Sequence, residues 1–266
     1  MKKTLNVLSL SVLSAVAVSA GENLVKNGDF SQGGINWSTT AIFNKVDQTF
    51  TLSPSRHTMI SKEIIPIDTQ STYKMTVKLS GANYSALFCG LIPVDKNGNI
   101  IYTRNASVVR GSDSVLLQDV SAGSDTIMVK KAPNWKLHRY ANVAFNTKPD
   151  LSDLPNFDVA AVKSVTGKAD GVEVKFSKPL EKSYAAGTGV RMHTDGATYI
   201  YLIRFPKDIS QGVELSDNIG PRTRDRFRAG TVGVKVYLFM SAPRSSKDAK
   251  LVVEEIRFEK IAPAAK

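Results

Sequence analysis

Four arginines occupy every second position in one segment of the chain, a spacing suited to binding anions. They are Arg222, Arg224, Arg226 and Arg228. If this segment is extended, alternate side chains point the same way and the four guanidinium groups form one row. Guanidinium groups bind carboxylate or sulfate through paired N–H donors, so the spacing predicts an anion-binding stripe. The alternative is a solvated loop whose charge Asp225 partly neutralises.

Aromatic side chains beside polar ones indicate a second kind of chemistry, the stacking of sugar rings. One face of a pyranose presents C–H groups to an aromatic ring, while its hydroxyls need polar partners. We expect Tyr237 to be the main platform because it shares a strand face with Lys235, opposite an aliphatic face. Tyr102, close to Arg104, is the second choice, and Tyr199 is a further candidate. Packing in the core is the alternative for each of these rings.

Trp135 joins the candidates because Lys136, His138 and Arg139 follow it closely. This combination would place an aromatic ring for stacking among cationic side chains. The remaining aromatic candidates for ring stacking are Tyr84, Phe88, Tyr201 and Phe239.

The sequence carries no signature of catalysis. It lacks a His-Glu-x-x-His motif, a Gly-x-Ser-x-Gly motif and a glycine-rich phosphate loop. The carboxylate pairs Asp150 with Asp153 and Asp170 with Glu173 could serve as acid and base, but solvated loop carboxylates are commoner. We therefore expect a protein that is not an enzyme. A polysaccharide lyase or glycosidase assembled from distant strands is the less favoured alternative.

Alternation of apolar and polar residues predicts strands throughout. Tyr73, Met75, Val77 and Leu79 would face the core while their neighbours face water. Residues 232–240 follow the same pattern, and residues 199–205 are apolar on both faces, which is typical of a central strand covered on both sides. Turn signals such as Asn97-Gly98 separate these runs, so we predict an all-β sandwich.

Between about residues 113 and 192 the sequence pattern changes to one typical of short hairpins. We interpret this stretch as a small β subdomain inserted into the sandwich, an arrangement tolerated when the two ends of an insertion lie close in space. The predicted organisation is a signal peptide at 1–20, a discontinuous jelly roll at 21–112 and 193–262, the insert at 113–192, and a tail at 263–266.

The two ends of the chain carry a family resemblance. Residues 23–30 read Asn-Leu-Val-Lys-Asn-Gly-Asp-Phe, Trp37 follows, and the chain closes on the alternating strand at 251–258. Together with residues 73–102, this pattern resembles the carbohydrate-binding modules of families 4 and 9, which are galactose-binding-like jelly rolls. The resemblance implies that the opening segment lies beside the last strand. It also implies a ligand held across the concave sheet or at the rim loops.

A structural calcium ion is a further expectation. Period two places Glu254 on the same face as Val252 and Ile256, and an inward carboxylate needs a cation or several donors. The resemblance implies such an ion near this end of the fold. The sequence departs from the family in having Glu254 where an Asp is usual and Ser31 where an acid is usual, and Asp29 could substitute for that acid if its side chain turns the right way. The alternative is that Glu254 pairs with an arginine or lies at the strand rim.

Charge and the first residues indicate export and anionic partners. Lys and Arg number 35 against 24 Asp and Glu, for a formal charge of +11. Met1-Lys2-Lys3, an apolar run and a small-residue site ending at Ala20 predict a bacterial-type signal peptide and a secreted or periplasmic protein. The run is shorter than the roughly 20 residues of a membrane span. Nucleic acid is disfavoured because its binding motifs are missing from the sequence.

These observations lead to one functional expectation. The protein is predicted to be an exported, non-catalytic module that binds a polysaccharide of acidic character. The alternative is a surface-layer, matrix or assembly protein that uses the same fold for contacts with other proteins.

Overall fold

Strands dominate the part of the chain that the computed structural model describes, which comprises residues 21–44, 46, 49–51, 56–246 and 249–261. The regular elements are strands β1 to β17 and one short helix, α1 (Thr103–Ala106). The prediction of an all-β fold is confirmed. The predicted signal peptide and the tail at 263–266 lie outside the described residues. No helix in the described ranges is long and apolar enough to cross a membrane.

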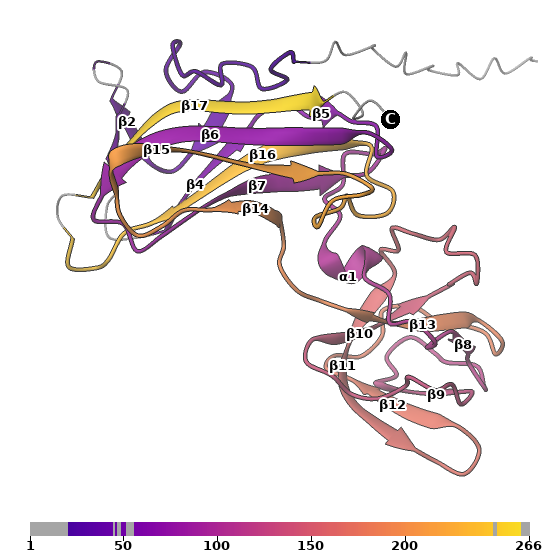
Figure 1. The fold of residues 1–266 in the computed structure, drawn as a ribbon. Coiled ribbons are helices and arrows are strands. Elements are labelled where there is room, and N and C mark those ends of the chain that lie inside the picture. Colours follow the sequence, from indigo (N-terminus) through magenta and orange to yellow (C-terminus); the bar gives the residue numbers. More distant parts are fainter. Residues whose placement is uncertain (1–20, 45, 47–48, 52–55, 247–248, 262–266) are drawn as a thin grey trace, which may run out of the picture.

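Two antiparallel sheets form the main sandwich (Figure 1). Sheet A has the order β1 (Trp37–Thr39), β4 (Arg56–Ser61), β16 (Gly233–Ser241), β7 (Ala86–Val94) and β14 (Ile200–Arg204), with β5 (Ile65–Pro66) also paired to β16. Sheet B has the order β15 (Ile209–Ile219), β6 (Thr72–Ala82), β17 (Lys250–Ile261), β3 (Thr49–Thr51) and β2 (Ile42–Asn44).

The predicted alternation of apolar residues builds the core between these sheets. Met75, Val77 and Leu79 of β6 are almost fully buried there, as are Val236 and Leu238 of β16. Because side chains alternate along a strand, the residues between them point away from the core. On β16 this sets the outer face of sheet A, which carries the candidate site.

Residues 199–205 are not a central strand, as their apolar pattern had suggested. Residues 200–204 form β14 at the edge of sheet A, paired only with β7 within that sheet. A register shift between Tyr201 and Ile203 turns both Leu202 and Ile203 into the core. Tyr199 and Tyr201 belong to the opposite face, so a bulge explains why both faces are apolar.

The insert forms a third sheet with a core of its own. Its order is β8 (Ser114–Val115), β13 (Gly189–Thr194), β10 (Ala141–Phe145), β11 (Val159–Gly167), β12 (Val172–Phe176) and β9 (Thr126–Val129). A bridge between Leu116 and Val129 links the two ends of this order, so the sheet closes on itself. Val143, Phe145 and Val174 fill its interior. Figure 1 shows this small β subdomain projecting from one end of the sandwich, so the predicted fold class is confirmed.

The opening segment lies beside the last strand, as the resemblance implied. Leu24 N donates to Phe258 O at 2.9 Å, and Ile256 N donates to Gly28 O at 2.7 Å. The Asn23 side chain donates to Ile256 O at 3.2 Å and accepts from Phe258 N at 3.1 Å. Trp37 packs over this segment, with its indole N–H donating to Asn27 O at 3.1 Å. The segment thus acts as a further partner for β17.

We expect Gly28→Ala to destabilise the protein, because a Cβ at residue 28 would overlap the main-chain oxygen of Ile256. Overpacking of this kind costs about 1–3 kcal/mol in the free energy of unfolding. Gly34→Ala is the matched control, since a Cβ at Gly34 meets nothing within 4 Å. Urea unfolding of both variants checks the prediction, and equal stabilities would contradict it.

Candidate functional site

The outer face of sheet A carries a cluster of aromatic rings, which we call the aromatic face. Tyr199 and Tyr237 have ring centroids 4.1 Å apart, and Tyr201 lies 6.4 Å from Tyr237 and 5.5 Å from Phe88. Phe88 in turn lies 6.0 Å from Phe239. The members of the aromatic face are Phe88, Tyr199, Tyr201, Tyr237 and Phe239.

Strand register explains why these rings meet. Tyr237 and Tyr201 both pair with Gly90, on opposite sides of β7. Gly90 has no side chain to separate the two tyrosines. A Cβ there would also overlap the main-chain oxygen of Ile200, so the close approach of β14 requires glycine. The edge strand therefore brings two tyrosines against β16.

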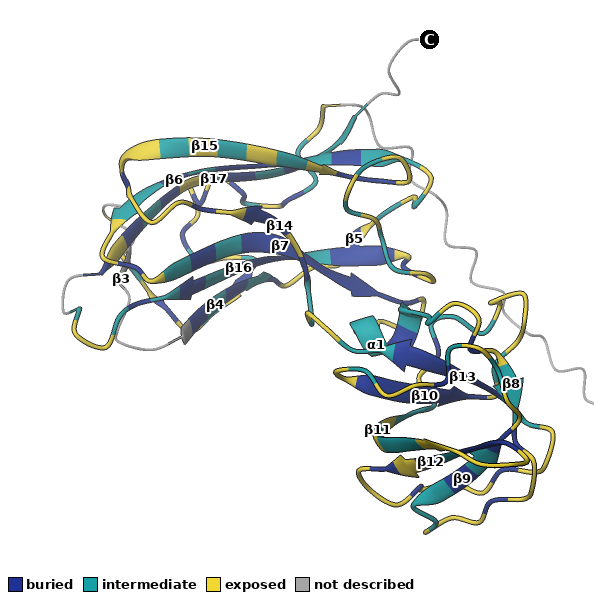
Figure 2. Ribbon diagram, turned by 60° about the horizontal axis from the view of Figure 1, so that its bottom comes forward, coloured by how far each residue is buried: buried dark blue, intermediate teal, exposed yellow. Residues whose placement is uncertain are grey.

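Cations border the aromatic face. The bulge in β14 turns Arg204 outward, where its guanidinium lies 5.5 Å from the ring of Phe88. Arg204 is exposed, and Lys235 of β16 is half-buried. In Figure 2, sheet A is the layer of the sandwich on the side where the insert lies. The face thus combines ring surfaces with donors for polar or anionic groups.

Tyr237 does not form the surface of this cluster. Its side chain is only 3% exposed because neighbouring rings cover it, whereas Tyr201 is 41% exposed. The sequence correctly placed Tyr237 opposite the aliphatic face, yet Tyr201 is the more accessible ring. Burial raises the pKa of Tyr199, and the nearby hydroxyls of Tyr201 and Tyr102 raise it further.

Tyr102 and Arg104 lie at the junction between the sandwich and the insert. The Arg104 guanidinium stacks 4.7 Å from the Tyr102 ring centroid and pairs with Asp195 at 3.3 Å. Two of the predicted sugar-binding residues therefore contact each other at this junction.

The predicted arginine stripe does not form. Residues 221–224 are in a turn, so the segment is not extended. Arg224 pairs with Asp217 and Asp225, both at 2.8 Å. Arg222 and Arg226 are exposed. The alternative of a partly neutralised loop describes this segment better than a row of guanidinium groups.

Arg228 has a different role from the rest of the predicted stripe. Its guanidinium donates to the carbonyl oxygens of Ile101, Ala197 and Thr198, and to Thr103 Oγ1 at 2.9 Å. Burial lowers its pKa to about 10, so it remains charged at neutral pH. Because it binds both chain segments that lead into the insert, Arg228 clamps the two parts together and is not a ligand-binding residue.

Trp135 is a core residue and not a stacking platform. It is 7% exposed and packs in the core of the insert, with its indole N–H donating to Ser112 O at 2.8 Å. The sequence signal was misleading because a tryptophan among cations can face either way in a loop. The exposed ring in this loop is Tyr140.

Glu254 does not point into the core, as its period-two position had suggested. A register shift between Val253 and Glu255 places Val253 and Ile256 in the core, and Glu254 is exposed. Period two was wrong here because one extra residue in a bulge reverses the faces that follow it. Asp29 is also exposed and accepts hydrogen bonds from Ser31. No cluster of metal ligands occurs within the described ranges.

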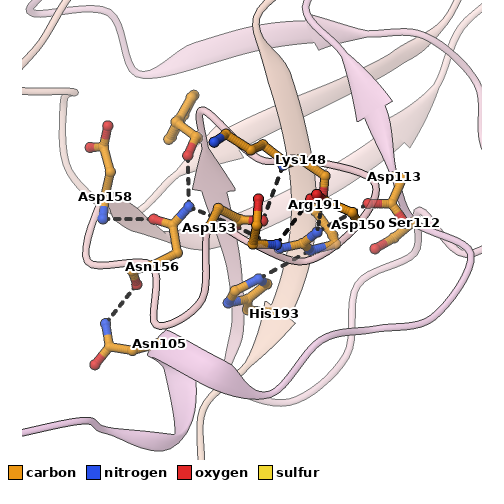
Figure 3. A network of polar contacts seen from close by, with 12 residues as sticks. Asn105, Ser112, Asp113, Lys148, Asp150, Asp153, Asn156, Asp158, Arg191 and His193 are labelled. Carbon is orange, nitrogen blue, oxygen red and sulfur yellow. Dashed lines mark hydrogen bonds and ion pairs between the residues drawn. The ribbon is translucent and has the colours of Figure 1, made fainter. Parts of the chain in front are cut away.

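A buried polar network that sequence reasoning missed joins α1 to the insert (Figure 3). Arg191 is fully buried, pairs with Asp153 at 2.7 Å and with Asp113 at 3.2 Å, and donates from Nε to His193 Nε2 at 3.4 Å. His193 Nδ1 donates to Arg104 O at 2.7 Å, and burial lowers the pKa of His193. The ring is therefore neutral, and Asp153 is a structural partner of Arg191 and not half of an acid–base pair.

The insert also contains a cleft of about 320 Å³. At its wall, Asp158 accepts hydrogen bonds from Tyr184 at 2.8 Å, Lys182 at 3.1 Å and Asn146 at 3.0 Å. Burial raises the pKa of the Tyr184 hydroxyl, and its bond to Asp158 raises it further. The carboxylate is thus fully engaged within the protein.

Comparisons with known proteins give remote likenesses. No protein-family model and no curated protein matches the sequence. The CBM22-1 xylan-binding domain of Paenibacillus barcinonensis Xyn10C is 10% identical, with 93% of this chain and all of that one covered and a TM-score of 0.31. The Emp47p carbohydrate recognition domain is 11% identical, with 86% and 90% covered and a TM-score of 0.32.

A third solved structure belongs to a larger protein. The enzymatically active domain of tailspike protein 4 from bacteriophage CBA120 is 7% identical, with a TM-score of 0.35. The match covers 90% of this chain and 21% of the tailspike chain. The first two structures are carbohydrate-binding or carbohydrate-recognition domains. At these TM-scores none of the likenesses identifies a ligand.

Proposed function

We propose that this protein binds carbohydrate on the aromatic face and makes or breaks no covalent bond. The observation that carries the proposal is the contact of five rings, four on three neighbouring strands and Tyr199 just before β14, on a sheet face that points away from the core. Aromatic side chains contribute large apolar areas and are ordinarily buried, yet Tyr201 remains 41% exposed on this face. Its ring is open to a partner.

A sugar ring fits this surface better than a purely apolar partner. The exposed Tyr201 ring supplies a stacking plane, and its hydroxyl can exchange hydrogen bonds with sugar hydroxyls. Arg204 and Lys235 lie at the border and would bind acidic groups of a polysaccharide. The ligand we propose is therefore a polysaccharide of acidic character. The leader at residues 1–20 supports a secreted or periplasmic location for this activity.

The test is a glycan array carrying neutral, uronic and sulfated polysaccharides, probed with residues 21–266. We expect selective binding that is lost in the double variant Tyr201→Ala/Phe239→Ala. The absence of binding to every glycan by the folded protein would overturn the proposal. It would favour a surface-layer, matrix or assembly protein whose aromatic face contacts another protein.

Arg204→Gln tests the acidic character of the ligand. We expect affinity for a uronic or sulfated polysaccharide to fall about threefold, since an exposed ion pair is worth less than about 1 kcal/mol. Affinity for a neutral glycan should not change. Lys163→Gln, at an exposed site on the insert, is the charge-matched control. Titration calorimetry at two salt concentrations measures the effect, and equal losses in both variants would contradict the assignment.

A further inference from the structure

One loop of the insert carries positive charge that no carboxylate balances. We call residues 130–140 the basic loop. It contains Lys130, Lys131, Lys136 and Arg139, and the sequence has no Asp or Glu between Asp125 and Asp150. All four cationic side chains are exposed.

These cations have no ion-pair partner within the described part of the chain. Some other exposed cations do have a partner: Lys182 pairs with Asp158 at 3.1 Å, and Arg224 pairs with Asp217 at 2.8 Å. A fifth exposed cation, Arg110, belongs to a segment tied to the loop by the bond from Asn134 Nδ2 to Arg110 O at 2.6 Å. Like charges at this density repel one another unless an anion intervenes.

The fold holds the basic loop in place. Trp135 anchors its middle in the core of the insert, with its indole N–H bound to Ser112 O at 2.8 Å. At its end, Asp195 N donates to Tyr140 O at 2.9 Å, and Ala141 N donates to His138 O at 3.2 Å. The loop backbone that carries the cations is thus ordered before a ligand binds, which reduces the entropy lost on binding.

The loop also presents an aromatic ring. Tyr140 is 57% exposed, and the Arg139 guanidinium lies 4.6 Å from its ring centroid. Tyr140 has a φ of 63°, in the left-handed region that a bulky residue rarely adopts. Backbone strain of this kind persists where the surroundings enforce it and is often found at binding sites. A ring beside a guanidinium can stack on a sugar while the cation binds an acidic substituent.

We propose that the basic loop is a second binding surface, separate from the aromatic face, for an acidic polysaccharide. Lys130, Lys131, Lys136 and Arg139 bind sulfate or carboxylate groups along the polymer, and one sugar ring stacks on Tyr140. The proposal stands on the charge and exposure of the loop and does not depend on the function of the aromatic face.

Other polyanions fit the loop less well. Insertion into an anionic membrane requires a substantial apolar area, and only Leu137 and Tyr140 protrude as exposed large hydrophobic side chains of this loop. Single-stranded nucleic acid requires several aromatic rings on which successive bases stack, and the loop exposes one. A sulfated or carboxylated sugar needs only the ring and the cations that are present.

The test compares two charge-matched triple variants. Lys130→Gln/Lys131→Gln/Lys136→Gln removes three charges from the basic loop. Lys96→Gln/Lys163→Gln/Lys178→Gln removes three exposed charges elsewhere that have no ion pair among the described residues. Binding of residues 21–266 to heparin and to polygalacturonate is measured across a range of salt concentrations. We expect the loop variant to lose about tenfold in affinity and to show a weaker salt dependence, with little change in the control.

Tyr140→Ala supplies a second test, because it removes the ring and leaves the charge of the loop unchanged. We expect lower affinity for polygalacturonate with an unchanged salt dependence. Equal losses in both triple variants, or no loss in either, would overturn the proposal. So would tighter binding of the unaltered protein to phosphatidylglycerol vesicles or to an oligonucleotide. Tyr201→Ala, which tests the aromatic face, should not alter the salt dependence of heparin binding, whereas the loop variant should, so the two proposals can fail separately.

Discussion

Tyr201→Ala is expected to lower the affinity for polysaccharide about tenfold, the largest effect of a single change on binding. Tyr201 is the most exposed ring of the aromatic face, and its edge strand is anchored through the bulge at Leu202 and Ile203. Removal of the ring takes away its stacking surface while the anchoring residues stay buried. A loss of about 1–1.5 kcal/mol corresponds to this change in affinity.

The controls separate stacking from folding and from hydrogen bonding. Tyr201→Phe keeps the ring and should retain most of the affinity. Phe157→Ala removes an aromatic side chain of similar exposure from the insert and should leave binding unchanged. Titration with a polysaccharide found on the array measures all three variants. If Phe157→Ala weakens binding as much as Tyr201→Ala does, the aromatic face is not the site.

Arg191→Met should reduce the free energy of unfolding by about 3–5 kcal/mol, the largest effect on stability. The Arg191 side chain is fully buried, and its partner Asp153 is 6% exposed. Removal of the cation would leave the Asp153 carboxylate buried without its charge partner, which is costly in a low-dielectric interior. The loss should appear as a lower urea midpoint for the insert.

Two further variants test the cause. Arg224→Met removes an exposed ion-paired arginine, 74% exposed, and should cost no more than about 1 kcal/mol. Arg191→Met/Asp153→Leu removes both charges and should recover much of the lost stability. If the double variant is less stable than Arg191→Met, the buried charge on Asp153 is not the origin of the loss.

The same pair gives stability a pH dependence. Burial alone would raise the pKa of Asp153, but hydrogen bonds from Asn156, the Lys148 amide and Arg191 outweigh it, so the pKa lies below 3.8. The folded state therefore favours the ionised carboxylate. Its contribution is complete above the unfolded pKa and is lost as the pH falls through the folded value. Unfolding of Arg191→Met should show a weaker dependence on pH in this acidic range.

The alternation of residues allowed much of the sandwich to be predicted. Tyr237 and Phe239 were placed opposite Val236 and Leu238 because side chains on a strand alternate, and the structure agrees. The same rule was wrong at Glu254 and at residues 199–205, where bulges shift the register. A bulge depends on how neighbouring strands pair, which one strand's pattern does not encode.

The loop residues of the site were harder to predict from the sequence than the strand residues. Trp135 and the arginines from 222 to 228 have residue types suited to binding, but loop backbones follow no period that orients the side chains. Tertiary contacts bury Trp135 in the core of the insert. They also place the Arg228 guanidinium against the carbonyl oxygens of the segment that leaves the insert. No signal in the sequence connected Arg191 with Asp153, since 38 residues separate them.

The sequence by itself determined the all-β class, the interruption by a small β subdomain, the pairing of the opening segment with the last strand and the excess of positive charge. The fold class, the subdomain and the charge follow from local alternation, turn residues and composition, whereas the pairing of the two ends follows from the family resemblance. Only the tertiary structure decided which rings meet on the aromatic face, which cations are paired and which remain open to a ligand. Those outcomes depend on strand register and on contacts between distant segments, which arise when the sheets pack together.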